Sequence, residues 1–255
     1  MSLKTAVVTG ANRGLGLEIV KQLSEREDVG KIFALCRKAG DKLKATEKIE
    51  VVEGINIMDD AVVKKLQDLF KTKSSSLTPI HCLIHNAGAY GPPEKFNGIG
   101  EIFQSQSLSN VTMERMRFAF EVNTLAPLKI TQALQPNLKE KVIIITSLMG
   151  SITDNTSGGS YGYRTAKAGV NMIGKSLAED LKEDGIAVGL IHPGIVATGF
   201  GNSEGKDWET KLFSSQRGVV ESAKGVLEAV DSITIETTGA FLHGNYGEGV
   251  KPLPW

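Results

Sequence analysis

Short apolar runs that alternate with longer amphipathic segments restrict this chain to a small set of folds. The runs are continuously apolar, which is typical of parallel strands that are covered on both faces. Helix-period segments lie between them, for example residues 60–70 after the third run. This alternation predicts an α/β fold, a doubly wound, Rossmann-type parallel sheet of about seven strands flanked by helices. The expected strands are residues 5–9, 31–36, 49–55, 80–85, 141–146, 186–192 and 239–243.

The composition of the chain is typical of one globular domain, which we expect to span residues 1–255. No Pro/Gly/Ser-rich linker divides the chain. Lys+Arg and Asp+Glu both number 29, so charge gives no reason to expect nucleic acid or a membrane surface as a partner. No apolar run approaches the ~20 residues of a membrane span, and the first strand begins too early for a cleavable targeting segment. We therefore predict a cytoplasmic protein, with Cys36 and Cys82 as reduced thiols.

A glycine-rich turn follows the first expected strand directly. The segment TGANRGLG places Gly10, Gly14 and Gly16 between that strand and a helical pattern. In such a turn bare backbone can approach a pyrophosphate, and the amide end of the helix attracts its negative charge. The position after the first strand of an alternating fold therefore predicts nucleotide binding.

The end of the second strand indicates which nicotinamide cofactor would bind. An acid at this point binds the ribose hydroxyls of NAD, but here Cys36 stands in its place, followed by Arg37 and Lys38. Arg13 lies inside the glycine turn. Guanidinium groups without an opposing carboxylate suit a 2′-phosphate, so we predict NADP (NADPH).

Two long irregular regions follow strand ends, residues 89–108 and 199–218. Ligands of open parallel sheets bind at the carboxyl ends of the strands. We expect both regions to form the rim of a substrate site.

Six motifs in order make the chain resemble the short-chain dehydrogenase/reductase family, and within it the sniffer-type carbonyl reductases and the C-factor group. They are TGANRGLG, HNAG (85–88), the asparagine of FEVN, ITS ending at Ser147, YRTAK from Tyr163, and HPGIVAT (192–198). The resemblance implies catalytic roles for Ser147, Tyr163, Lys167 and Asn123. It implies cofactor binding by Gly10, Asn12, Arg13, Gly14, Leu15, Gly16, Arg37, Asn56, Asn86, Ala87, Gly88, Tyr163, Lys167, Pro193, Gly194, Val196 and Thr198.

The resemblance also implies the reaction. A small aldehyde, ketone or quinone would be reduced to an alcohol, with Tyr163 as proton donor and Ser147 bonded to the carbonyl oxygen. Lys167 would hold the nicotinamide ribose, and Asn123 would support a water-mediated proton path. Because Tyr163 and Lys167 are four residues apart, they can meet on one helix face, and an ammonium there is expected to lower the pKa of the phenol.

Two assignments stay open at this point. Ser147 lies further from Tyr163 than is usual in the family and Ser151 lies nearer the usual spacing, but only Ser147 ends a strand directly. After the third strand, members of the family usually carry an Asp near the adenine, and this chain has Asn56 there, so the assignment of Asn56 to adenine binding also stays open. Tyr161, two residues before Tyr163, has Thr165 four residues on and is expected to pack or line the substrate side.

Other functions fit the residues less well. GGSYG (158–162) matches the nucleophile elbow of hydrolases around Ser160, yet the residues before it are a polar loop rather than a strand. His81, His85 and His243 lack the spacing of metal ligands, so no metal is predicted. The apolar helical region 112–135 suggests a homo-oligomer, a dimer or tetramer. A non-catalytic NADP-binding sensor or signalling protein on the same fold is the alternative function.

Overall fold

The computed structural model describes residues 4–71, 77–92, 99–196, 218–244 and 247–255. Eight strands in these ranges form one sheet in the order β3-β2-β1-β4-β5-β6-β7-β8. All neighbours pair in parallel except β7 and β8. The strands are β1 (Lys4–Thr9), β2 (Val29–Leu35), β3 (Ile49–Val52), β4 (Ile80–His85), β5 (Leu138–Ile145), β6 (Ala187–His192), β7 (Ala240–His243) and β8 (Lys251–Pro252).

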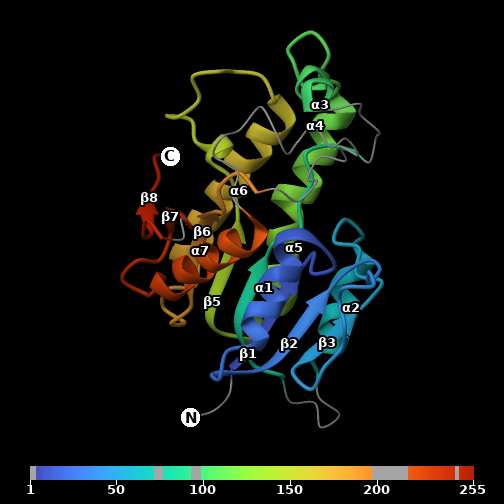
Figure 1. The fold of residues 1–255 in the computed structure, drawn as a ribbon, viewed down its shortest axis with the longest axis vertical. Coiled ribbons are helices and arrows are strands. Elements are labelled where there is room, and N and C mark those ends of the chain that lie inside the picture. The colour runs from blue at the N-terminus through green and yellow to red at the C-terminus, as the bar shows by residue number, and fades with distance from the viewer. Residues whose placement is uncertain (1–3, 72–76, 93–98, 197–217, 245–246) are drawn as a thin grey trace.

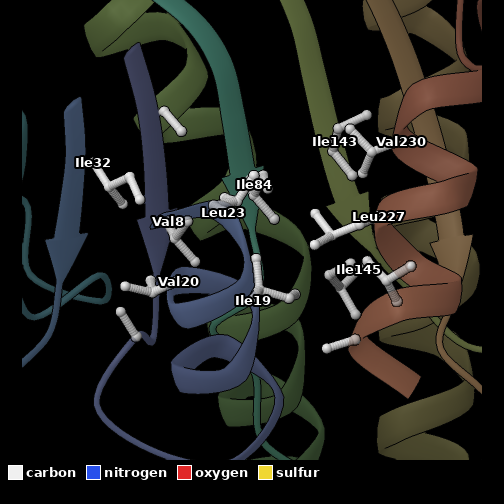
Figure 2. Close-up of a cluster of buried hydrophobic side chains, with 14 of the residues drawn as sticks. Val8, Ile19, Val20, Leu23, Ile32, Ile84, Ile143, Ile145, Leu227 and Val230 are labelled. Carbon is white, nitrogen blue, oxygen red and sulfur yellow. The ribbon is translucent and has the colours of Figure 1, made fainter. Parts of the chain in front are cut away.

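Helices cover both faces of the sheet, as the continuous apolar strands require. On one face, α1 (Gly14–Ser24) and α7 (Val219–Ser232) contact each other and share one buried cluster with the strands (Figure 1). On the other face, α2 (Ala61–Leu69), α5 (Ala126–Leu134) and α6 (Tyr161–Asp180) share a second cluster. Figure 2 shows part of the first cluster, with Ile19, Val20 and Leu23 of α1 and Leu227 and Val230 of α7 around Val8, Ile84, Ile143 and Ile145.

The remaining helices are short. Short helices α3 (Ile99–Ser105) and α4 (Met113–Phe120) lie at the top of Figure 1. A π-helical turn, η1 (Glu121–Leu125), continues α4 into α5. Two 3₁₀ turns, η2 (Gln135–Asn137) and η3 (Leu148–Gly150), flank β5.

The predicted fold class is confirmed, and all seven expected strands are present. Some details of the prediction were wrong. The third strand ends at Val52 because Gly54, with φ of 68°, turns the chain. The antiparallel β8 is additional. The irregular region 89–108 contains α3, whereas region 199–218 lies outside the described residues apart from Gly218. Both cysteines are free thiols, and no helix in the described ranges is long and apolar enough to cross a membrane.

The packing of α6 against the sheet gives a test of this fold. A Cβ at Gly174 would lie 2.6 Å from Cδ2 of Leu190, which is fully buried in β6. Gly174→Ala should therefore lower the free energy of unfolding by about 1–3 kcal/mol, although alanine favours helix. Gly100→Ala in α3 is the matched control, because a Cβ there would have no described atom within 4 Å. Urea unfolding measures the free energy of unfolding of both variants. Equal stability of the two would contradict the close packing of α6 against β6.

Candidate active site

A cleft of about 360 Å³ opens at the carboxyl ends of the central strands. It begins at the turn after β1, and β1 lies between β2 and β4, where the connections of the sheet reverse direction. Open α/β sheets bind their ligands at this switch point. The sequence-predicted residues that line the cleft are Gly10, Asn12, Arg13, Gly14, Leu15, Gly16, Arg37, Asn56, Asn86, Ala87, Gly88, Ser147, Tyr163, Lys167, Pro193, Gly194 and Val196. Thr198 lies outside the described residues.

The glycine turn is joined to the end of β4 by close contacts. The side-chain amide of Asn86 donates to the carbonyl oxygens of Thr9 and Gly10 at 3.0 and 3.2 Å. The Thr9 hydroxyl accepts the backbone N–H groups of Asn86 and Ala87, both at 3.1 Å. A Cβ on Gly16 would lie 2.3 Å from Nδ2 of Asn86. Only glycine therefore fits at this point of the turn.

The end of the cleft beside the glycine turn and β2 carries positive charge. Arg13, at the N-cap of α1, and Arg37, after β2, are exposed and line the cleft. Asp and Glu are absent from the described residues that line it. The nearby Glu53 accepts the backbone N–H of Ala39 and does not line the cleft. The charge pattern suits a phosphate at this end better than bare ribose hydroxyls.

The opposite end of the cleft brings Ser147 and Tyr163 together. Ser147 lies two residues after the end of β5 and caps η3, where its Oγ accepts the N–H of Met149 at 3.2 Å. Its hydroxyl is hydrogen-bonded to the phenol of Tyr163, which is 8% exposed. Ser151 is buried and accepts the N–H of Asp154 instead. The geometry therefore favours Ser147 over Ser151 as the partner of the phenol.

Lys167 lies one helical turn after Tyr163 and faces the same cleft. Its Nζ donates to the carbonyl oxygen of Ile145 at 2.9 Å and lies 5.7 Å from the centroid of the Tyr163 ring. Burial lowers the pKa of Lys167 to about 8. Burial also raises the pKa of Tyr163, while the hydrogen bond from Ser147 opposes this shift. The sequence predicted that the Lys167 ammonium would lower the pKa of the phenol, whereas burial is the largest effect and shifts this pKa upward.

Asn123 supports the cleft from behind. It lies in the π-helical turn η1 and is buried. Its Nδ2 donates to the carbonyl oxygens of Ala89 and Ala119 at 2.8 and 2.9 Å, and its Oδ1 accepts the N–H of Ala89 at 3.2 Å. A Cβ on Gly88 would lie 2.9 Å from that Oδ1. Asn123 thus fixes the backbone after β4 and is not a lining residue of the cleft.

Sequence reasoning missed several lining residues, among them Met58, Phe118, Val122 and His192. The three apolar residues carry no motif and reach the cleft only through the packing of the chain. His192 directly precedes Pro193 and Gly194, which were predicted to line the site, and this position could have predicted that His192 lines it too. Its ring stacks on that of His243 with centroids 5.0 Å apart, and burial lowers its pKa to about 3.

The other singled-out residues serve the structure. His81 accepts the N–H of Thr5, and His85 is hydrogen-bonded to Thr131. In the described part of the chain, no three His, Cys, Asp or Glu side chains gather as metal ligands would. Ser160 follows a loop, and its hydroxyl is bonded to the hydroxyl of Tyr90 rather than to a histidine. Tyr161 is exposed and does not line the cleft.

Comparison with known proteins agrees with this geometry. The family model for short chain dehydrogenase matches residues 4–209. The chain belongs to this family, which confirms the resemblance found in its motifs.

Its relatives include a 1-hydroxy-2-glutathionyl-2-methyl-3-butene dehydrogenase of Rhodococcus sp. (strain AD45), 33% identical over 95% of this chain and 97% of the relative. The C-signal protein of Myxococcus xanthus is 32% identical over 69% of this chain and 93% of its own. Among solved structures, the NADPH-bound carbonyl reductase from chicken fatty liver is 28% identical with a TM-score of 0.81, and both chains are fully covered. The carbonyl reductase Sniffer of D. melanogaster is 25% identical with a TM-score of 0.79 and equal coverage.

The buried lysine gives a pH-dependent test of the site. The pKa of Lys167 is about 8 in the fold against an ordinary 10.5. Between these values the unfolded chain binds the extra proton, so this residue makes stability rise with pH, and below pH 8 its buried charge costs on the order of 3 kcal/mol. Lys167→Met should therefore be more stable than the wild type at pH 7, with the difference shrinking toward pH 10.

Urea unfolding at both pH values, without added nucleotide, measures this effect. Lys175→Met removes a partly exposed lysine of the same helix and is the matched control, with an expected change below about 0.5 kcal/mol. A stability difference for Lys167→Met that does not vary with pH would show that the ammonium is not buried at a cost.

Proposed function

We propose that this protein is an NADPH-dependent reductase that converts aldehydes, ketones or quinones to alcohols. The observation that carries the proposal is the hydrogen bond between Ser147 and Tyr163 beside Lys167, inside the cleft that the glycine turn begins. Family membership and the two similar carbonyl reductases support it. A protonated phenol can supply the proton that reduction of a carbonyl group needs.

The cofactor part of the proposal rests on charge and space. Arg13 and Arg37 would bind the 2′-phosphate, and the residues lining this end of the cleft in the described ranges include no carboxylate that would repel it. The backbone of the glycine turn would face the pyrophosphate at the N-terminus of α1. The similar carbonyl reductase from chicken was crystallised with NADPH.

In the proposed mechanism, bound NADPH supplies the hydride for the carbonyl carbon. Tyr163 gives its phenolic proton to the carbonyl oxygen, which completes the alcohol. The Ser147 hydroxyl, held by its place just after β5, donates a hydrogen bond to the same oxygen as negative charge develops there. The Lys167 ammonium stabilises the phenolate that remains. Asn123 keeps the backbone after β4 in place beside them.

The alternative is a non-catalytic NADP-binding sensor or signalling protein. The relative named C-signal shows that this family includes a protein named for signalling. A pure binder has no need of a buried serine–phenol pair next to a lysine of lowered pKa, and this cluster favours the enzyme.

The predicted homo-oligomer, dimer or tetramer, and the cytoplasmic location remain predictions. A homo-oligomer would need an exposed apolar surface, and exposed Met113 and Phe120 on α4 and Leu125 on η1 supply one.

Loss of the phenolic hydroxyl tests the proposed chemistry. Tyr163→Phe should lower kcat for NADPH-dependent reduction about 10²- to 10⁴-fold, because the proton donor is lost, while NADPH affinity persists. Tyr161→Phe is the matched control and should keep wild-type turnover. The assay uses purified protein with a panel of aldehydes, ketones and quinones. Tight NADPH binding by the wild type without oxidation by any substrate would favour the sensor.

Reversal of one charge tests the cofactor preference. Arg37→Asp should reduce the preference for NADPH over NADH by about tenfold or more, because a charged hydrogen bond to the phosphate is replaced by repulsion. Lys38→Asp changes the adjacent exposed side chain, which does not line the cleft, and is the control. The ratio of kcat/KM for the two cofactors measures the effect. An unchanged ratio for Arg37→Asp would refute the phosphate site.

A further inference from the structure

A buried glutamine joins two segments of the active site. Gln106 follows α3 directly and is 1% exposed. Its Nε2 donates to the backbone carbonyl of Tyr90 at 2.6 Å, and its Oε1 accepts the backbone N–H of Tyr163 at 3.1 Å. One side-chain amide thus links the segment after β4 to the first turn of α6.

The start of α6 needs an acceptor from elsewhere. The first N–H groups of a helix have no partner within it, and a serine at the N-cap usually accepts one of them. Here the N-cap Ser160 has φ of 51° and follows Gly158 and Gly159, which also have positive φ. Its hydroxyl is bonded to the Tyr90 hydroxyl and caps no N–H of the helix. Gln106 supplies the missing acceptor, at the residue that carries the phenol.

The same glutamine holds the neighbour of that phenol. The rings of Tyr90 and Tyr163 are in contact, with centroids 4.9 Å apart and planes at 33°. Gln106 fixes the backbone of both residues, and the hydroxyl pair of Tyr90 and Ser160 closes the cluster on the other side. The space is tight, because a Cβ on Gly162 would lie 3.1 Å from Oε1 of Gln106.

We propose that Gln106 is a positioning residue for Tyr163, holding the first turn of α6 and the ring of Tyr90 in the arrangement that proton transfer requires. The catalytic part of this inference rests on the proposed function. Gln106 does not line the cleft, and it acts through two backbone groups, the carbonyl of Tyr90 and the N–H of Tyr163. A side chain with one acceptor and one donor at its end is needed, and glutamine provides both. A small displacement of the phenol is costly, since a shift of about 1 Å can lower turnover about 10²-fold.

The test compares the same substitution at two glutamines that are two residues apart in the sequence. Gln106→Met keeps the length of the side chain and removes both hydrogen bonds, whereas Gln104→Met changes an exposed residue of α3. For Gln106→Met we expect kcat to fall about 10- to 100-fold, with NADPH affinity within about twofold of wild type. The N–H of Tyr163 should exchange with solvent at least about tenfold faster in hydrogen-exchange experiments. Gln104→Met should change none of these.

Wild-type kcat for Gln106→Met, or unchanged exchange of the Tyr163 N–H, would overturn the proposal. If this variant does not fold, Gln106→Glu replaces it, because a carboxylate keeps the acceptor for Tyr163 but cannot donate to Tyr90. Burial favours the protonated carboxyl, which can still donate, so kcat should fall relative to the wild type as pH rises and the carboxyl ionises, while the Tyr163 N–H stays protected. A kcat equal to that of the wild type at every pH would overturn the proposal. The exchange experiment needs no substrate. If the wild type reduces no carbonyl compound, the proposed function fails, and exchange still decides whether Gln106 caps α6.

Discussion

The junction between the turn after β1 and the end of β4 is the contact on which the cleft depends. Thr9 and Asn86 exchange backbone and side-chain hydrogen bonds there, and Gly16 packs against the Asn86 amide. Because these bonds are satisfied inside the protein, the helix that follows can direct its amide end toward the cleft. The junction also fixes the backbone that leads to Ala89, which Asn123 holds from the other side. One set of contacts therefore sets the geometry at both ends of the site.

Burial decides the electrostatics of the reacting groups. Tyr163 and Lys167 are removed from water together, so the pKa of the phenol rises and that of the amine falls. Each shift favours the neutral form of its group. The phenol that results is a proton donor at neutral pH, and an amine with a pKa of about 8 can change charge close to the working range. The hydrogen bond with the Ser147 hydroxyl orients the phenolic hydroxyl of Tyr163. Position and burial thus account for the chemistry that we propose.

The sequence predicts those parts of the molecule that depend on local pattern. Continuous apolar runs predicted every parallel strand, and the glycine spacing predicted the turn that begins the cleft. The role of Gln106 could not be predicted, because it depends on contacts with Tyr90 and Tyr163, 16 and 57 residues away. Spacing from Tyr163 favoured Ser151 and strand position favoured Ser147, and the hydrogen bond between Ser147 and the phenol agrees with the strand position. In the sequence, GGSYG (158–162) matches a nucleophile elbow around Ser160. In the structure, Gly158, Gly159 and Ser160 all have positive φ, and this turn places Tyr163 in the first turn of α6.

The most direct test of the account follows the hydride. NADPH carrying deuterium at C4 of the nicotinamide, on one face in each of two preparations, is incubated with the protein and a reducible aldehyde, and the alcohol is examined by mass spectrometry. The proposed mechanism requires the cleft to hold the nicotinamide in one orientation, so one preparation should transfer its deuterium to the carbonyl carbon and the other should transfer none. Alcohol without deuterium from both preparations, or equal transfer from both, would contradict it.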